Sequence, residues 1–224
     1  STSEKNYAKE NNIFIGKNNI VINNGVKNRK IKNFYKNQIF NKKGNNLSDH
    51  KVIVISVCRL VKQKNIFELI KIAQLVPYVE FKVIGDGPLL NEILNFLEKN
   101  KINNINFLGY KSNLFDYLYS SSIFLSTSFY EGLPNTILEA MSVGLPILAT
   151  DVAGNCDTFE HKKSGFLYPL GDINCAAKYL RKLANDCSLR EKLGKASFTR
   201  QREFFSLETM RENYTKFYFD IKKL

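Results

Sequence analysis

The feature that most constrains the fold is a regular alternation of short apolar runs and segments of helical periodicity between residues 52 and 168. The run 52–56 is almost entirely apolar, as expected for a parallel strand covered on both faces. The segment 65–76 instead repeats apolar residues every three or four positions, as an amphipathic helix does. Such alternation predicts an α/β fold, a parallel sheet with helices on both faces. We predict strands at 52–56, 81–84, 105–108, 123–126, 147–150 and 165–168.

The ends of the chain are also predicted to contain regular structure. After Asp172 the spacing of apolar residues predicts helices at 173–185, from 188 to about 200, and from 207 to the end. Near the other end we expect a helix capped by Ser3, then a strand at 19–22 and a turn at 23–26. Ligands of parallel sheets bind outside the carboxyl ends of the strands, so motifs at strand ends should converge in space.

The composition supports one large domain, or one domain with part of another. The 224 residues are 44% hydrophobic, and no apolar run is long enough to cross a membrane. No signal peptide is present either, so we expect a cytoplasmic chain. The four Cys residues are scattered and there are only two His residues, which predicts reduced cysteines and no zinc site.

The formal net charge of +12 has three explanations: binding to nucleic acid, attraction to anionic phospholipid, and a compositional bias toward Lys, Asn and Ile. The basic residues are spread widely and form no nucleic-acid-binding motif. Residues 27–43 are basic without any acid, while Phe34, Tyr35, Ile39 and Phe40 predict packing on one side. We therefore expect no nucleic acid partner, and peripheral contact with the inner face of the membrane.

The stretch 129–146 predicts a loop, a short helix and a stop directly after a strand. Pro134 suits the first helical position, and Gly144 suits the residue just past the helix end. The N-terminus of this helix can bind a phosphate through its free amides. Glu131 and Glu139 flank that end, and carboxylates suit hydroxyl groups rather than bare phosphate. The implied ligand therefore carries both a phosphate and a sugar.

The order Glu-Gly-Leu-Pro, four residues, then Glu-Ala-Met-Ser-Val-Gly-Leu-Pro resembles the Glu-(seven residues)-Glu signature of retaining glycosyltransferases of the GT-B fold, most closely glycosyltransferase family 4. The resemblance implies the Rossmann-like, C-terminal donor-binding half of such an enzyme. It also implies that Glu131 faces the donor sugar and that Glu139 accepts hydrogen bonds from ribose hydroxyls. The loop between them would contact sugar and phosphate through Gly132, Leu133, Pro134 and Asn135.

Three further segments match the same resemblance. The run from Cys58 to Asn65 resembles a Gly-Arg-Leu-(three residues)-Lys loop, in which Arg59 and Lys64 would hold the donor diphosphate as catalytic cations. Gly85 belongs to a matching Gly-Asp-Gly turn, whose glycines can equally serve turn geometry alone. Tyr110 and Lys111 are the expected contacts of the nucleotide base, although a Tyr at a strand end often only packs.

The region beyond the glutamates carries fewer expectations. Residues 151–154 are expected to complete the rim of the site. The resemblance assigns no role to Glu160, because the sequence departs there from the pattern of the resembling family. We expect His161 to lie on the surface.

These expectations define a domain plan. We predict an acceptor-domain remnant and crossover at 1–26, a basic linker at 27–50, a nucleotide-sugar-binding domain at 51–205 and a C-terminal helix at 206–224. The N-terminal acceptor domain would be almost wholly missing, so that part of the aromatic terminal helix would be exposed.

The predicted function is transfer of a sugar from a nucleotide diphosphate sugar to a hydroxyl of a glycan or lipid-linked acceptor, in bacterial surface polysaccharide or glycolipid synthesis. The resemblance implies retention of the anomeric configuration and chemistry without a metal or other cofactor. The alternatives are an epimerase or phosphorylase relative, and a nucleotide-sugar-binding fragment without activity of its own.

Overall fold

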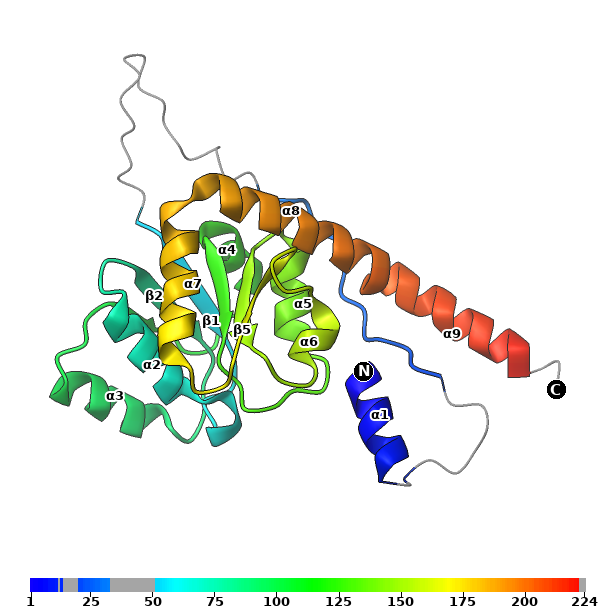
Figure 1. Cartoon of the computed structure of the whole chain (residues 1–224), viewed down its shortest axis with the longest axis horizontal. Helices are drawn as coiled ribbons and strands as arrows, with labels where there is room; N and C mark the ends of the chain where they lie inside the picture. The colour runs from blue at the N-terminus through cyan, green and yellow to red at the C-terminus, as the bar shows by residue number, and fades with distance from the viewer. Residues whose placement is uncertain (12, 14–19, 33–50, 222–224) are drawn as a thin grey trace, which may run out of the picture.

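A computed structural model of the chain describes residues 1–11, 13, 20–32 and 51–221. Its centre is a six-stranded parallel sheet with helices on both faces, which confirms the predicted α/β fold (Figure 1). The strands are β1 (Ile53–Val57), β2 (Glu80–Ile84), β3 (Ile105–Phe107), β4 (Ile123–Ser126), β5 (Ile147–Thr150) and β6 (Gly165–Tyr168). The helices are α1 (Thr2–Glu10), the 3₁₀ helix η1 (Lys62–Lys64), α2 (Ile66–Leu75), α3 (Leu90–Lys99), α4 (Leu114–Ser120), α5 (Asn135–Ser142), α6 (Asn155–Thr158), α7 (Ile173–Asn185), α8 (Cys187–Phe204) and α9 (Leu207–Ile221).

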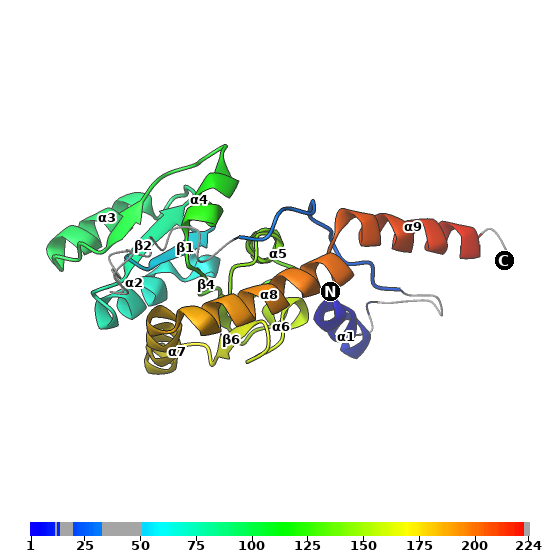
Figure 2. The same ribbon diagram turned by 90° about the horizontal axis from the view of Figure 1, so that it is seen from above.

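The two faces of the sheet are covered by different helices because successive strand residues point to opposite sides. Val54 of β1 belongs to the core that α2, α3 and α7 cover, whereas its neighbour Ile55 belongs to the core under α4 and α5. Both side chains are fully buried. Figure 2 shows the two layers on either side of the sheet. Burial on both faces explains why the strands are apolar almost without interruption.

The strand order β3-β2-β1-β4-β5-β6 places a switch point between β1 and β4. The chain builds outward from β1 through β2 to β3 and then returns to the other side of β1. The loops that follow β1 and β4 therefore leave the same edge of the sheet in opposite directions, which opens a crevice for ligands. The two loops are tied together there, since the Thr127 hydroxyl donates to the Lys64 carbonyl (2.9 Å) and Phe129 N–H donates to the Gln63 carbonyl (2.9 Å).

The structure corrects two local predictions at helix ends and adds one short helix. Ser1, not Ser3, caps α1, in a capping box with Glu4. Pro134 is the N-cap residue of α5 rather than its first helical residue. The short helix α6 was not predicted, because four residues are too few to show a helical period.

The predicted strand at 19–22 is also wrong for its described residues, 20–22, which form no strand; Asn19 lies outside the described residues. A strand needs a neighbouring strand to pair with, and the backbone bridge described for this segment lies farther along the chain. Val26 forms an isolated parallel bridge with Ser206, between α8 and α9. The aromatic residues expected to pack in the basic segment, 34–40, also lie outside the described residues.

The last helix, α9, extends away from the body of the sheet (Figure 1). Its aromatic side chains are largely exposed, at 62% for Tyr218 and 59% for Phe219. None of the helices that the structure describes is long and apolar enough to cross a membrane.

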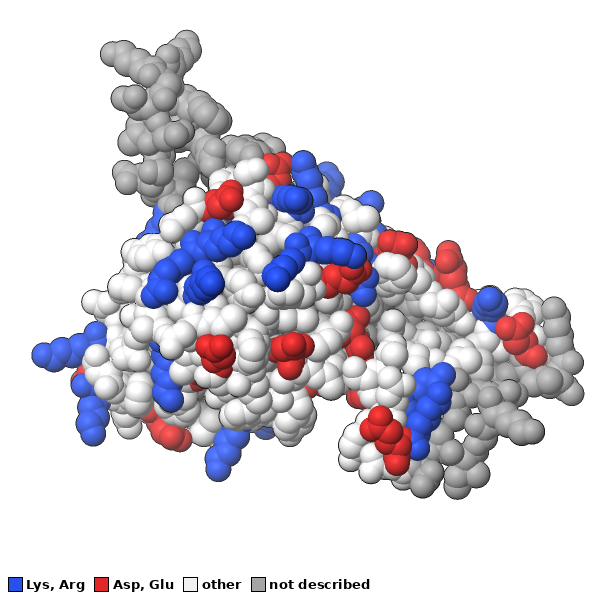
Figure 3. All heavy atoms as spheres, viewed as in Figure 1, with Lys and Arg blue, Asp and Glu red and all other residues white. Residues whose placement is uncertain are grey.

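Basic side chains gather on the face formed by α7 and α8 (Figure 3). The exposed basic residues of these two helices are Lys178, Arg181, Lys182, Lys192, Lys195 and Arg202.

Candidate functional site

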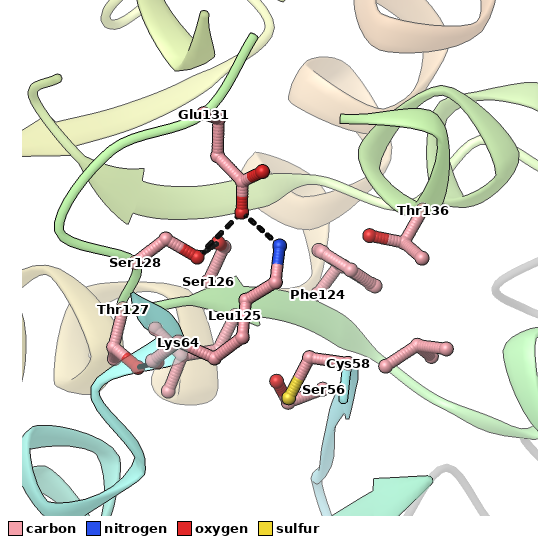
Figure 4. A pocket seen from close by; sticks show the side chains of 11 residues that line it. Ser56, Cys58, Lys64, Phe124, Leu125, Ser126, Thr127, Ser128, Glu131 and Thr136 are labelled. Carbon is pink, nitrogen blue, oxygen red and sulfur yellow. Dashed lines mark hydrogen bonds and ion pairs between the residues drawn. The ribbon is translucent and has the colours of Figure 1, made fainter. Parts of the chain in front are cut away.

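A small pocket opens at the switch point, between the carboxyl ends of β1 and β4 (Figure 4). Main-chain geometry brings its walls together, because the loop after β1 and the loop before α5 leave neighbouring strands. The pocket is lined by Ser56, Val57, Cys58, Lys64, Phe124, Leu125, Ser126, Thr127, Ser128, Glu131 and Thr136.

An ion pair spans the mouth of this pocket. Lys64 Nζ lies 2.5 Å from Glu131 Oε1, and the Ser128 hydroxyl donates to the same oxygen at 2.6 Å (Figure 4). The exposed fractions of the two charged side chains are 21% for Lys64 and 9% for Glu131. No described residue donates a hydrogen bond to the other carboxylate oxygen, Glu131 Oε2. This oxygen remains able to accept a hydrogen bond from a ligand hydroxyl.

Arg59 occupies the same loop as Lys64 but differs from it in environment. Its side chain is exposed and makes no ion pair or hydrogen bond with the described residues. The loop between the two cations turns through η1 and ends at Asn65, whose φ of 49° is left-handed. Arg59 is thus a free cation beside the pocket, whereas Lys64 is already neutralised by Glu131.

The glycine turn after β2 supports the wall of the pocket from behind. A Cβ at Gly85 would lie 1.9 Å from the Cys58 carbonyl oxygen, and the φ of Gly85 is +133°. Only glycine allows this approach. Burial raises the pKa of the Cys58 thiol to about 11, so the thiol stays protonated near neutral pH. Gly85 thus shapes the loop of Cys58, and whether it also touches a donor stays a prediction.

The N-terminus of α5 faces the pocket through Thr136 (Figure 4). The N-cap residue, Pro134, gives no side-chain cap, so the first amides of the helix keep their donor capacity. Asn135 is exposed and accepts a hydrogen bond from Asn24 at 3.4 Å. Leu133 packs into the core under α5.

The loop before α5 is enclosed by its neighbours. A Cβ at Gly132 would meet Glu4 Oε1 of α1 at 2.5 Å, and a Cβ at Gly154 would meet the Gly132 carbonyl at 2.4 Å. The predicted rim segment 151–154 therefore packs against the loop that carries Glu131.

Glu139 lies one turn into α5 and is half-buried, but it does not line the pocket. Burial raises the pKa of its carboxyl group, and the positive charge of Arg29 partly offsets this. Tyr110 is 79% exposed and Lys111 is half-buried, and neither lines the pocket. The structure thus brings Glu131, Lys64 and the start of α5 into one pocket, whereas Arg59, Glu139, Tyr110 and Lys111 are not among its lining residues.

Several polar lining residues were not predicted from the sequence, namely Ser56, Ser126, Ser128 and Thr136. Their position at or near the ends of buried strands could have indicated them. The predictions instead relied on the glutamate motif.

His161 was predicted to lie on the surface, and this is wrong. It is half-buried, its Nδ1 accepts a hydrogen bond from Leu167 N–H at 2.9 Å, and its ring contacts Tyr179. His161 lies four residues before β6 and forms an isolated bridge with Gly165, the first residue of that strand.

No group of three or more His, Cys, Asp or Glu side chains within the described residues could hold a metal ion. The expected chemistry without a metal stays a prediction.

Comparison with known proteins identifies the class of this chain. Residues 37–200 match the family model described as glycosyl transferases group 1. This match covers more than half of the chain, so the chain belongs to that family.

Individual relatives agree with this assignment. The chain is 28% identical over 221 residues to the capsular polysaccharide biosynthesis glycosyltransferase CapM of Staphylococcus aureus, which covers 95% of the chain and 57% of CapM. It is 28% identical over 184 residues to N-acetyl-alpha-D-glucosaminyl L-malate synthase of Bacillus anthracis, covering 80% of the chain and 48% of that protein. The chain thus spans only about half the length of these relatives.

Solved structures show the same fold. A crystal structure of a variant of S. aureus TarM, in complex with fondaparinux, alpha-GlcNAc-glycerol and UDP, matches with a TM-score of 0.81 at 27% identity, over 95% of this chain and 42% of TarM. Sucrose-phosphate synthase from Thermosynechococcus elongatus matches with a TM-score of 0.82 at 20% identity, over 100% of this chain and 57% of that one, and shows the fold alone.

Proposed function

We propose that this chain forms the nucleotide-sugar-binding half of a retaining glycosyltransferase, which transfers a sugar from a nucleotide diphosphate sugar to a hydroxyl group. The observation that carries the proposal is the pocket at the switch point, where the Lys64–Glu131 ion pair faces the uncapped N-terminus of α5. A cation and helix amides suit a diphosphate, and a carboxylate with a free oxygen suits a sugar hydroxyl. The relatives named as glycosyltransferases support the same reaction class.

The proposed chemistry breaks the bond between the anomeric carbon and the diphosphate oxygen and forms a bond from that carbon to the acceptor oxygen. Arg59, Lys64 and the first amides of α5 stabilise the negative charge that develops on the departing diphosphate. Lys64 has three N–H donors, so it can contact Glu131 and a phosphate oxygen together. Glu131 binds the donor sugar, and the leaving phosphate takes the proton of the incoming hydroxyl. No step requires a metal.

The nucleoside end of the donor is assigned to the residues around the pocket. Glu139 accepts hydrogen bonds from the ribose hydroxyls, and Tyr110 and Lys111 border the base. These groups lie near the carboxyl edge of the sheet, where ligands of such folds bind.

The acceptor is proposed to be a glycan or a lipid-linked sugar at the inner face of the membrane. One relative, 30% identical over 62% of this chain and 38% of its own length, is named UDP-Gal:alpha-D-GlcNAc-diphosphoundecaprenol alpha-1,3-galactosyltransferase of Escherichia coli. The basic face of α7 and α8 would favour an anionic membrane surface. An N-terminal acceptor domain would complete the enzyme.

Calorimetric titration of the chain tests the proposal directly. UDP, GDP, ADP and their glucose or N-acetylglucosamine derivatives are titrated in turn, with EDTA present to remove divalent metals. We expect one base to be preferred and its sugar nucleotide to bind at least as tightly as the diphosphate. A chain that binds none of these compounds contradicts the proposal. Conversion of a sugar nucleotide to its epimer, followed by NMR, would favour the epimerase alternative.

A further inference from the structure

A buried carboxylate that the proposed chemistry does not use lies beside the loop that carries Lys64. Glu68, in the first turn of α2, is 7% exposed. Its Oε1 accepts a hydrogen bond from the Tyr168 hydroxyl at 3.0 Å, and its Oε2 accepts one from Asn65 Nδ2 at 2.6 Å. Because a buried carboxylate is costly unless its oxygens are paired, these two donors determine how Glu68 is held.

Tyr168 anchors this carboxylate in the core. Its side chain is fully buried at the end of β6, 100 positions along the chain from Glu68. Burial and the neighbouring carboxylate raise the pKa of the Tyr168 hydroxyl well above its ordinary value, so the hydroxyl keeps its proton and remains a donor. One oxygen of Glu68 is therefore fixed by the core, and the other is left for Asn65.

Asn65 has a left-handed backbone conformation, with φ 49° and ψ 48°. Glycine adopts this conformation freely, and Asn is one of the few other residues that adopt it at modest cost. Although Asn65 is the N-cap residue of α2, its side chain does not cap the helix. It donates to Glu68 instead, and Glu68 N–H donates to the Asn65 carbonyl at 3.0 Å. This reciprocal pair of hydrogen bonds fixes the left-handed turn.

The turn at Asn65 determines where the preceding residue, Lys64, points. The Thr127 hydroxyl contacts the carbonyls of both Lys64 (2.9 Å) and Asn65 (3.1 Å). From this turn the Lys64 side chain enters the pocket and pairs with Glu131 at 2.5 Å (Figure 4). A change of φ at Asn65 would rotate the peptide of Lys64 relative to α2. The position of the Lys64 ammonium group therefore depends on this turn.

We propose that Glu68 is a positioning residue for diphosphate binding, because through Asn65 it holds the left-handed turn from which Lys64 reaches the pocket. This inference rests on the proposed contact between Lys64 and the donor diphosphate. Glu68 does not itself touch the donor, since both of its oxygens are engaged inside the protein. The competing explanation is that Glu68 serves only the stability of α2.

Four variants separate these two explanations. Glu68→Met removes both acceptor oxygens and keeps an unbranched side chain. Glu68→Gln keeps an acceptor for Asn65, while the Tyr168 hydroxyl can accept from the new amide. Tyr168→Phe is the matched control, because it removes one partner of the same carboxylate and leaves the contact with Asn65. Glu68→Met combined with Asn65→Gly removes that contact but supplies a residue that adopts the left-handed turn without it.

Calorimetry measures the affinity of each variant for UDP, and urea unfolding measures its stability. Lys64→Met is titrated alongside them to test the contact on which the inference rests. Circular dichroism shows whether each variant folds. If Glu68→Met does not fold, Glu68→Met with Tyr168→Phe replaces it throughout, because that pair leaves no buried hydroxyl unpaired.

We expect Glu68→Met to lower the affinity for UDP about tenfold, because the Lys64 ammonium group is no longer held at the diphosphate. Glu68→Gln should bind UDP within about threefold of the parent. Tyr168→Phe should lower the urea midpoint but bind UDP within about twofold of the parent. Adding Asn65→Gly to Glu68→Met should return the affinity to within about threefold of the parent. The loss of stability caused by the unpaired Tyr168 hydroxyl should remain.

The results that would overturn the inference are distinguishable from failure of the proposed function. If Lys64→Met weakens UDP binding and Glu68→Met does not, only the inference fails. It also fails if Asn65→Gly does not restore the affinity lost in Glu68→Met, since Glu68 then acts through general stability. If the parent does not bind UDP, or Lys64→Met binds it as the parent does, the proposed role of Lys64 fails first and the inference falls with it.

Discussion

At the scale of single residues, the pocket depends on one ion pair, in which a lysine compensates the charge of a nearly buried carboxylate. The Glu131 carboxylate, 9% exposed, is balanced by Lys64 and hydrogen-bonded by Ser128. We expect Lys64→Met to lower the free energy of unfolding by about 1–3 kcal/mol, because it leaves a nearly buried carboxylate with one hydroxyl partner. Urea unfolding measures this loss.

The double variant Lys64→Met with Glu131→Gln separates stability from binding. It should recover much of the lost stability, because no buried charge remains unpaired. It should not recover the affinity for UDP, which calorimetry reports, because the cation itself is still absent. Recovery of both would show that Lys64 serves only the ion pair.

Arg59 gives a cleaner test of diphosphate binding, because the exposed side chain supports no described contact. Arg59→Met should weaken UDP binding by about 1.5–3 kcal/mol, the contribution of a charge-assisted hydrogen bond, and should leave the unfolding midpoint unchanged. Lys62→Met, an exposed cation on the same loop, is the matched control. Equal losses in both variants would indicate only a general effect of charge.

At the scale of elements, the strands were predictable and the pocket lining was not. Each predicted strand from 52 to 168 exists, because a strand buried on both faces must be apolar throughout. The apolar run at 20–22 shows that apolar residues alone are not sufficient. These residues form no strand, because no neighbouring strand is placed to pair with them. The Lys64–Glu131 pair joins residues 67 positions apart. Sequence spacing could suggest that both bind a donor, but not that they bind one another.

The glycine turn after β2 permits a test of loop geometry. Gly85→Ala should lower the free energy of unfolding by more than about 2 kcal/mol, since the new Cβ would meet the Cys58 carbonyl at 1.9 Å. Gly109→Ala is the control, because it also has a positive φ (+68°) but no atom within 4 Å of the added Cβ. It should cost only about 1 kcal/mol. Similar urea midpoints for the two variants would contradict the steric explanation.

Lys32, in the segment of residues 26–32, makes the free energy of unfolding depend on pH. Burial, with the charge of Arg190, lowers the pKa of Lys32 from 10.5 to about 8. At pH values between these two pKa values, the Lys32 side chain holds more protons in the unfolded chain than in the native one. The free energy of unfolding therefore rises with pH in this range. The rise should be about 1–2 kcal/mol, because Lys32 is only partly buried.

Urea unfolding at pH 7.5 and 9.5 measures this rise in the parent and in Lys32→Met. Lys32→Met should lose the rise in unfolding free energy with pH. Lys30→Met removes an exposed lysine of the same segment, residues 26–32, and should keep that rise. Identical pH dependence in the parent and Lys32→Met would rule out Lys32 as the source.

At the scale of the whole molecule, the pocket lies on an edge of the sheet rather than inside the protein. Loops from β1 and β4 form its walls, and one helix terminus forms its end. The chain spans 57% of the length of CapM and 42% of that of TarM. Donor binding and transfer to an acceptor, as proposed above, can therefore be tested separately with the 224-residue polypeptide.

We predict that this polypeptide by itself binds a sugar nucleotide but transfers no sugar. Binding needs only the groups around the pocket, namely the two cations, the start of α5 and the two glutamates. Transfer also needs an acceptor hydroxyl held in line with the anomeric carbon, and a second wall that excludes water. Such positioning supplies about 7–11 kcal/mol of barrier reduction, so turnover without it should be unmeasurable.

The preferred sugar nucleotide is incubated with the chain and with glycan and lipid-linked acceptors, and mass spectrometry detects any added sugar. Adding the acceptor-binding portion of a relative such as CapM as a separate polypeptide asks whether a supplied wall restores turnover. Robust transfer by the 224-residue polypeptide alone would mean that the described groups already position the acceptor.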